Sequence, residues 1–258
     1  MNPQKIALLT DSCADLSVQM VQEYHIFVVP LRILCADGEY ADGVDIHGAD
    51  IYRRLHNGEL PQTSLPSGAY IEKVLRQIWE EGYDGVIAVM LSSGLSGTYN
   101  LVRLAAEECG NLLPVRVFDS VSGSLGQGAT VLQLAEDIRG GMSWEELTER
   151  RAPQLIANTF PFFSVDTLEY LQKGGRIGKV TATAGTLLQI KPIITFADDG
   201  QLKSIAKVRG RNQVISKLIE LTVQRCGEHR RYNLAVANGG APEEMQLVRQ
   251  RLTEALPN

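Results

Sequence analysis

The chain has 258 residues, of which 44% are hydrophobic and 21% charged, and its net charge at pH 7 is −5. This composition is typical of a globular protein with one large domain or two modest ones. The acidic balance disfavours non-specific nucleic-acid binding, and the longest apolar runs are too short to span a membrane. The four cysteines and four histidines show no metal-ligand or disulfide spacing, so we expect no metal and no cofactor. The N-terminus has no signal-peptide pattern, so we expect a cytoplasmic protein.

The first half of the sequence alternates strand and helix patterns, which favours an α/β fold with a parallel sheet flanked by helices. The predicted strands cover residues 6–10, 26–34, 86–91 and 115–118, and the predicted helices cover residues 17–24, 49–57, 68–81, 98–109 and 126–139. An Asp/Gly-rich loop is expected over residues 37–45, and no clear strand precedes Thr63-Ser64.

Hydroxyl-rich turns follow three of these strands, at residues 10–12, 92–98 and 119–124. The middle turn, L-S-S-G-L-S-G-T-Y at residues 91–99, joins a buried strand to a helix. Its glycines allow close approach of a ligand, and the helix start offers unpaired N–H groups. Helix capping alone explains any one turn, but three at the carboxyl edge of one sheet favour a site for an anion, either phosphate or carboxylate.

The pattern changes after residue 140. Ser143 and Glu146 predict a helix start with a capping box. Strands are then predicted over residues 162–165, 192–196, 205–208 and 234–237, with a hairpin turn at residues 198–200 and helices over residues 168–173 and 213–224. We therefore predict an α/β domain over residues 1–154 and a smaller C-terminal α+β domain over residues 155–258.

Several segments together resemble the DegV family, over roughly residues 5 to 240. The matching segments are T-D-S-C-A-D-L at residues 10–16, V-P-L at 29–31, Y-A-D-G-V-D at 40–45, T-S-L-P-S at 63–67, S-S-G-L-S-G-T-Y at 92–99, D-S at 119–120, T-L-E-Y-L-Q-K-G-G-R-I at 167–177, I-K-P-I at 190–193 and K-V-R-G at 207–210. Leu65 stands where the family has Gln. Each motif alone is weak, but their fixed order is specific.

The resemblance implies a non-catalytic carrier that holds one long-chain fatty acid between two domains. In the family's best-understood role, the carrier is the lipid-binding subunit of bacterial fatty acid kinase, which serves phospholipid synthesis. A separate kinase protein converts the bound carboxylate to an acyl phosphate. The resemblance further implies that the carboxylate is bound by Thr63, Ser64, Ser93 and Ser96, with Ser93 preferred to Ser96, and that Arg176 is a nearby cation.

The acyl chain needs an apolar tunnel. Candidate lining residues are Phe162, Leu187, Leu188, Ile190 and Ile194, although plain core of the second domain better explains any single one of them. For an acid of about C14–C18, full burial at ~0.8 kcal/mol per methylene gives roughly 12 kcal/mol before entropic costs.

A basic group comprises Lys203, Lys207, Arg209 and Arg211. Arg209, with Lys207, matches the family position at which we expect docking of the kinase, and a solvated charged face is the alternative. Family members commonly continue past the position of Asn258 with a segment that carries a His near a Gly-Pro turn. We expect either a natural short form or a truncated C-terminal domain.

Two other functions compete with the carrier. A phosphotransferase could bind a phosphorylated small molecule at the serine turn, with Asp11, Asp119 and Asp166 as Mg²⁺ ligands, but the usual nucleotide-binding glycine motifs are absent. A DNA-binding regulator is disfavoured by the acidic charge and by the lack of a helix-turn-helix pattern.

Overall fold

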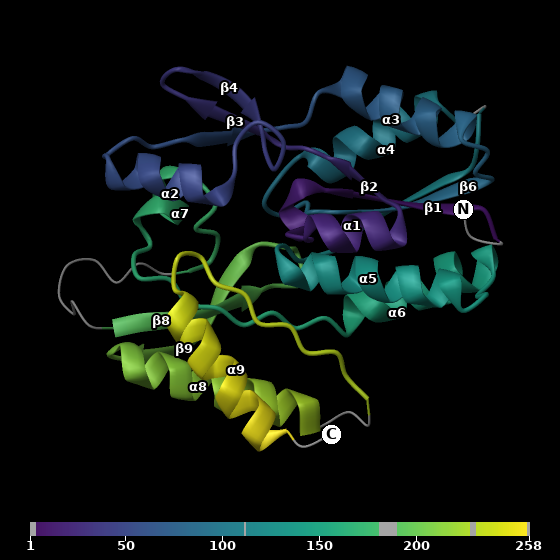
Figure 1. Ribbon diagram of the computed structural model, residues 1–258. Coiled ribbons are helices and arrows are strands. Elements are labelled where there is room, and N and C mark those ends of the chain that lie inside the picture. The colour runs from purple at the N-terminus through teal and green to yellow at the C-terminus, as the bar shows by residue number, and fades with distance from the viewer. Residues whose placement is uncertain (1–3, 111, 181–189, 228–230, 257–258) are drawn as a thin grey trace. The chain divides into compact units, whose positions relative to one another are not determined.

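The computed structural model describes residues 4–110, 112–180, 190–227 and 231–256. The backbone divides into two compact units, Met1–Thr159 and Phe160–Asn258, whose elements are labelled in Figure 1. The domain boundary expected after residue 154 stays a prediction. Within the described ranges, none of the helices combines the length and apolar character that crossing a bilayer requires.

A four-stranded parallel sheet forms the centre of the first unit, as predicted. Its strands are β1 (Ile6–Asp11), β2 (Ile26–Val29), β6 (Gly85–Met90) and β7 (Val115–Asp119), in the order β2-β1-β6-β7. All three pairings are parallel. Every residue of β1 and β6 is buried, which is the usual pattern for a parallel sheet covered on both faces.

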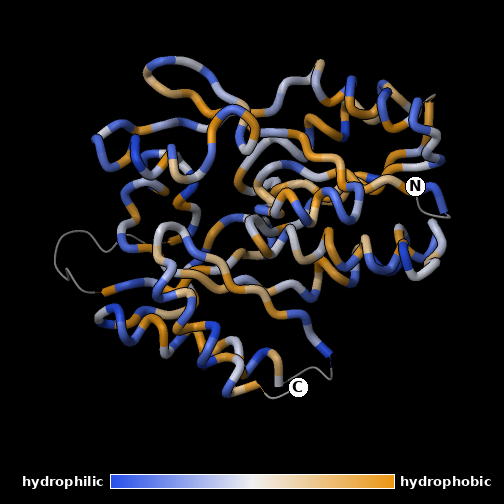
Figure 2. The backbone as a smooth tube through the Cα atoms, in the orientation of Figure 1, coloured by the Kyte–Doolittle hydropathy of each residue, from blue (hydrophilic) through white to orange (hydrophobic). Residues whose placement is uncertain are grey.

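Helices cover both faces of this sheet (Figure 1). They are η1 (Ser12–Ala14), α1 (Val18–Tyr24), α3 (Gly68–Glu80), α4 (Thr98–Glu108), α5 (Leu125–Arg139) and α6 (Ala152–Ala157). Ala7 and Leu9 pack against α3 and α4, whereas Ile6 and Leu8 pack with α5. This alternation follows from the two-residue period of a strand, and Figure 2 shows mixed hydropathy along the covering helices.

A second, antiparallel sheet lies in the same unit. It contains β3 (Arg32–Cys35), β4 (Gly38–Ala41) and β5 (Gln62–Ser64), in the order β4-β3-β5, with α2 (Gly48–His56) between β4 and β5 in the chain.

This sheet corrects three predictions. The single strand expected over residues 26–34 is two strands in different sheets, because Pro30 has no N–H for a ladder and the Leu31 N–H donates to the Ser12 hydroxyl at 3.1 Å. The loop expected over residues 37–45 contains β4. Thr63 and Ser64 belong to a short edge strand, whose polar residues gave no strand pattern.

The helix start predicted at Ser143 is present, since the Ser143 hydroxyl accepts the Glu146 N–H at 3.3 Å. The Glu146 carboxylate pairs with Arg150, four residues further on. A π-helical turn, η2 (Glu146–Arg151), then leads into α6.

The second unit is built on one hairpin. Its elements are α7 (Glu169–Lys173), β8 (Ile190–Phe196), β9 (Leu202–Arg209), α8 (Arg211–Gly227) and α9 (Pro242–Ala255). The two strands are antiparallel around the predicted turn at residues 198–200. The α+β character predicted for this part of the chain is therefore confirmed.

Two strands predicted in this unit are wrong, and one of its helices was not predicted. Residues 162–165 form only an isolated bridge between Phe163 and Ile194. Residues 234–237 have no regular structure, and Leu234 is 43% exposed, so its apolar character does not reflect a core position. Helix α9 was not predicted. It begins with Pro242, and Glu244 in its first turn pairs with Arg211 of α8.

Gly128 in α5 provides a test of how closely this helix approaches η1. A Cβ at Gly128 would lie 2.3 Å from the Ala14 carbonyl oxygen. We expect Gly128→Ala to lower the free energy of unfolding by about 1–3 kcal/mol, because the backbone must shift. Urea denaturation would measure this. Gly68→Ala is the control, since no atom lies within 4 Å of its added Cβ. Equal stability of the two variants would contradict the close approach.

Candidate functional site

The polar turns predicted at the strand ends are brought to one edge of the parallel sheet. β1, β6 and β7 are neighbours in the sheet and run in the same direction, so their carboxyl ends lie side by side. β1 leads into Asp11-Ser12, β6 into the serine turn at residues 91–98, and β7 into residues 119–124. In open α/β sheets, this is the edge where ligands bind.

Asp11 joins the ends of β1 and β6. Its carboxylate accepts the Leu91 N–H at 2.7 Å and the Cys13 N–H at 3.0 Å, and the residue is fully buried. Burial raises the pKa of Asp11 to about 6, although the hydrogen bonds from the backbone act in the opposite direction. Both carboxylate oxygens therefore accept backbone N–H groups, and Asp11 fixes the backbone at the start of the serine turn.

Gln127, in the first turn of α5, completes this support. It is fully buried, and its amide donates to the Thr10 hydroxyl at 3.0 Å and to the Val89 carbonyl at 3.2 Å. Gln127 is not part of a predicted motif, and its one signal in the sequence is a lone amide among glycines and apolar residues at the start of a helix.

Asp119 joins β7 to the serine turn. Each of its carboxylate oxygens lies 3.2 Å from the Ser93 backbone nitrogen, which donates to them, and Oδ1 also accepts the Val121 N–H at 2.9 Å. The Ser92 N–H donates to the Ser122 carbonyl at 2.9 Å. The two loops are therefore hydrogen-bonded to each other along their backbones.

The hydroxyls of the serine turn differ in accessibility. Ser92 and Thr98 are fully buried. The Ser96 hydroxyl lies 2.8 Å from the Thr98 hydroxyl and accepts the Thr98 N–H at 3.3 Å, so it is already bonded at the start of α4. Ser93 is exposed, and its hydroxyl has no hydrogen-bond partner among the described residues. Ser93 is thus the residue of this turn best placed to meet a ligand.

Thr63 and Ser64 lie on β5, at the edge of the antiparallel sheet. Successive residues of a strand point to opposite faces, so these two hydroxyls cannot face the same ligand. The Leu65 side chain lies next to the serine turn, with its methyls 3.5 and 3.6 Å from the point that a Cβ on Gly97 would occupy. Leu65 follows Thr63 by two residues, which is the spacing of side chains on one face of a strand, so this proximity favours Thr63 over Ser64.

The remaining candidates lie in the second unit. Arg176 is exposed on the turn after α7, and its guanidinium donates to the Gly174 carbonyl. Phe162 is half-buried, Ile194 is fully buried, and Ile190 lies on the same face of β8 as Ile194 by strand alternation. Leu187 and Leu188 lie outside the described residues. The acyl tunnel stays a prediction.

The predicted basic group does not form one surface. Lys207 and Arg209 lie two residues apart on β9, so they share one face, and both are exposed. Lys203 lies on the other side of a register shift in the β8–β9 pairing, so strand alternation does not place it on that face. Arg211 instead starts α8 and forms ion pairs with Glu244 of α9 and with Asp166. Its role is to hold helices together.

The structure gives little support to a metal site at the strand ends. Asp11 and Asp119 both accept backbone N–H groups, and Asp166 pairs with Arg211. Among the described residues, the group with metal-ligand spacing is Cys35, Asp37 and Glu59.

A guanidinium group already occupies the position that a metal ion would take between these side chains. Arg54 binds Asp37 through both guanidinium ends at 2.8 and 2.9 Å, and it contacts Glu59 at 3.0 Å. A metal ion would have to displace this guanidinium.

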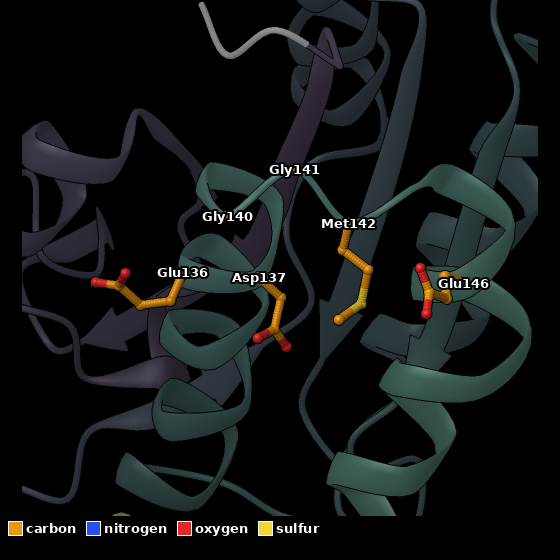
Figure 3. Close-up of a pocket in the computed structure, with 6 residues that line it drawn as sticks. All are labelled: Glu136, Asp137, Gly140, Gly141, Met142 and Glu146. Atoms are coloured by element: carbon orange, nitrogen blue, oxygen red, sulfur yellow. The ribbon is translucent and has the colours of Figure 1, made fainter.

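A cavity of about 370 Å³ lies away from the strand ends, at the C-terminal end of α5. Figure 3 shows the carboxylates of Asp137 and Glu146 on either side of Met142. Glu136, Asp137 and Glu146 each form an ion pair with an arginine. An acidic lining opposes binding of an anion, so this cavity is a poor candidate for a fatty acid.

A family model and a curated relative both match this chain to the DegV family. The model described as "Uncharacterised protein, DegV family" matches residues 5–258. A DegV domain-containing protein of Clostridium perfringens is 42% identical over 245 residues, which cover 95% of this chain and 86% of the relative.

Solved structures of similar proteins also match this chain. The crystal structure of DegV from Bacillus subtilis, described as a fatty acid binding protein, matches with a TM-score of 0.88 at 30% identity and covers 100% of this chain and 89% of its own. A stearic acid-binding protein of Eubacterium ventriosum matches with a TM-score of 0.80 at 27% identity, covering 96% and 87%.

The buried carboxyl of Asp11 predicts a pH dependence of stability. Because its folded pKa lies above the unfolded value, the folded state binds the proton more tightly, and its contribution to stability rises as the pH falls through about 6. Relative to Asp11→Asn, the unchanged protein should gain about 1 kcal/mol in free energy of unfolding between pH 8 and pH 5. Urea denaturation of both proteins at each pH would measure this difference, and a constant difference would contradict the assignment.

Proposed function

The chain belongs to the DegV family, and we propose that it binds one long-chain fatty acid and presents the carboxylate to a separate kinase for acyl phosphate formation. The fatty acid is supported by the descriptions of its structural neighbours from Bacillus subtilis and Eubacterium ventriosum. The kinase role is an inference from the family resemblance. A carrier of this kind has no complete active site of its own and works in the cytoplasm.

The observation that carries the proposal is the position of one accessible hydroxyl. Ser93 is exposed at the carboxyl edge of the parallel sheet, and the Leu65–Gly97 contact brings the Thr63 segment to the same turn. Two hydroxyls from separate segments suit a carboxylate, since each oxygen of the ligand can accept one hydrogen bond.

We assign the head-group contacts to Thr63 and Ser93. Ser96 ranks second because its hydroxyl already bonds Thr98. Ser64 ranks last because it lies on the other face of β5 from Thr63. Arg176 would supply a positive charge that complements the ionised acid.

The acyl chain supplies most of the binding free energy. Burial of a chain of about sixteen carbons gives roughly 12 kcal/mol at ~0.8 kcal/mol per methylene, and losses in chain and side-chain freedom reduce this. Our candidates for the lining are Phe162, Ile190 and Ile194, together with Leu187 and Leu188.

Docking of the kinase is assigned to Arg209 and Lys207. Both are exposed and lie on one face of β9, so they can attract an acidic surface on a partner protein.

Native mass spectrometry of the purified chain tests the proposal directly. A bound mass that matches a long-chain fatty acid supports it. ATP-dependent phosphoryl transfer by the isolated chain would favour the phosphotransferase instead.

The head-group assignment predicts the effect of Thr63→Ala combined with Ser93→Ala. We expect the affinity for palmitic acid to fall by about 10–100-fold, because two hydrogen bonds to a charged group are lost. Isothermal titration calorimetry would measure this. Ser64→Ala is the matched control and should bind normally. An equal loss in the control would move the contact to Ser64, and normal binding by the double variant would place the head group elsewhere.

The docking assignment predicts that Arg209→Glu leaves fatty acid affinity unchanged and lowers turnover in the presence of the kinase subunit by about tenfold or more, as expected for a reversed charge at an interface. Acyl phosphate formation would be measured with saturating fatty acid. Arg249→Glu makes the same charge change on an exposed site of α9 and should behave normally. Normal turnover with Arg209→Glu would refute the docking site.

A further inference from the structure

We propose that Asp119 is a positioning residue for head-group recognition, acting through Ser93. This inference rests on the proposed function, since it concerns how the same site is built. Asp119 does not touch the ligand in this proposal. Its carboxylate fixes the backbone that carries the Ser93 hydroxyl.

The geometry around the Ser93 amide supports this role. Both oxygens of Asp119 lie 3.2 Å from the Ser93 nitrogen. A free backbone N–H in this turn would itself be a donor for an anionic ligand. Because Asp119 accepts this N–H, the amide is no longer offered to the ligand, and the hydroxyl is the donor that remains.

The loop that carries Asp119 is held in an unfavourable conformation. Val121 has a φ of +48°, a region that β-branched residues rarely adopt. The bond from its N–H to Asp119 at 2.9 Å offsets part of this cost. Backbone strain that the surroundings maintain is characteristic of sites where geometry matters for binding.

Neighbouring hydrogen bonds connect the loop after β6 to the loop after β7. The Ser120 N–H donates to the Met90 carbonyl at 3.0 Å, and the Ser92 N–H donates to the Ser122 carbonyl at 2.9 Å. In these two loops, the Asp119 carboxylate is the side-chain group that accepts the Ser93 N–H. Its loss should therefore displace the exposed hydroxyl while the buried part of the turn stays in place.

A double-mutant cycle tests the proposal. The affinity for palmitic acid is measured by calorimetry for the full chain and for Asp119→Ala, Ser93→Ala and the double variant. We expect Asp119→Ala to weaken binding by about 5–20-fold, because the hydrogen bond from Ser93 is misdirected. In the Ser93→Ala background, the same change should weaken binding less than about twofold, since the residue through which it acts is gone.

Two further variants separate positioning from general stability. Asp119→Asn keeps an acceptor oxygen and should recover part of the affinity, and it replaces Asp119→Ala in the cycle if the alanine variant does not fold. Asp137→Asn removes a carboxylate that pairs with Arg151 at the far end of α5. It should lower the melting temperature without changing affinity.

Three outcomes overturn the inference. The first is normal affinity of Asp119→Ala, and the second is an equal effect of that substitution with and without the Ser93 hydroxyl. The third is an affinity loss in Asp137→Asn that matches the loss in Asp119→Ala at the same loss of stability. Failure of the unchanged chain to bind palmitic acid refutes the proposed function itself, which distinguishes the two.

Discussion

The site depends on carboxylates that accept backbone amides at the ends of neighbouring parallel strands. Asp11 binds the Leu91 N–H, and Asp119 binds the Ser93 N–H, so the serine turn is held from both sides of β6. A glycine-rich turn is conformationally free by itself. These two side chains restrict it to the conformation in which Ser92 is buried and Ser93 is exposed.

Much of the fold could be predicted because its elements carry strong local patterns. The continuous apolar runs of β1 and β6 and the amphipathic sequence of α3 predict structure without reference to their neighbours. The antiparallel sheet was missed because β3 was joined to β2 in one predicted strand, β4 is short, and β5 is polar and entirely exposed. Helix α9 was missed because it contains many charged residues and is fixed partly by the pair between Arg211 and Glu244, which is distant in sequence.

The candidate site, too, could be predicted only in part. The hydroxyl-rich turns were visible in the sequence, and the parallel order of the strands brought three of them to one edge. The family resemblance favoured Ser93 over Ser96, but the local pattern could not show which hydroxyl is accessible, since this depends on contacts with Asp119, Ser122 and Thr98. Asp11 and Asp119 were candidate Mg²⁺ ligands only under the phosphotransferase alternative, and the backbone N–H groups that they accept give them a supporting role.

The contact between Leu65 and Gly97 has a mechanical consequence. Thr63 lies on the antiparallel sheet and Ser93 follows the parallel strand β6, and the methyls of Leu65 pack beside the bare backbone of Gly97. Each such atom pair contributes only about 0.1–0.2 kcal/mol and has no directional preference. Packing of this kind therefore fixes the spacing between Thr63 and Ser93 less strictly than a directional hydrogen bond between the two segments would.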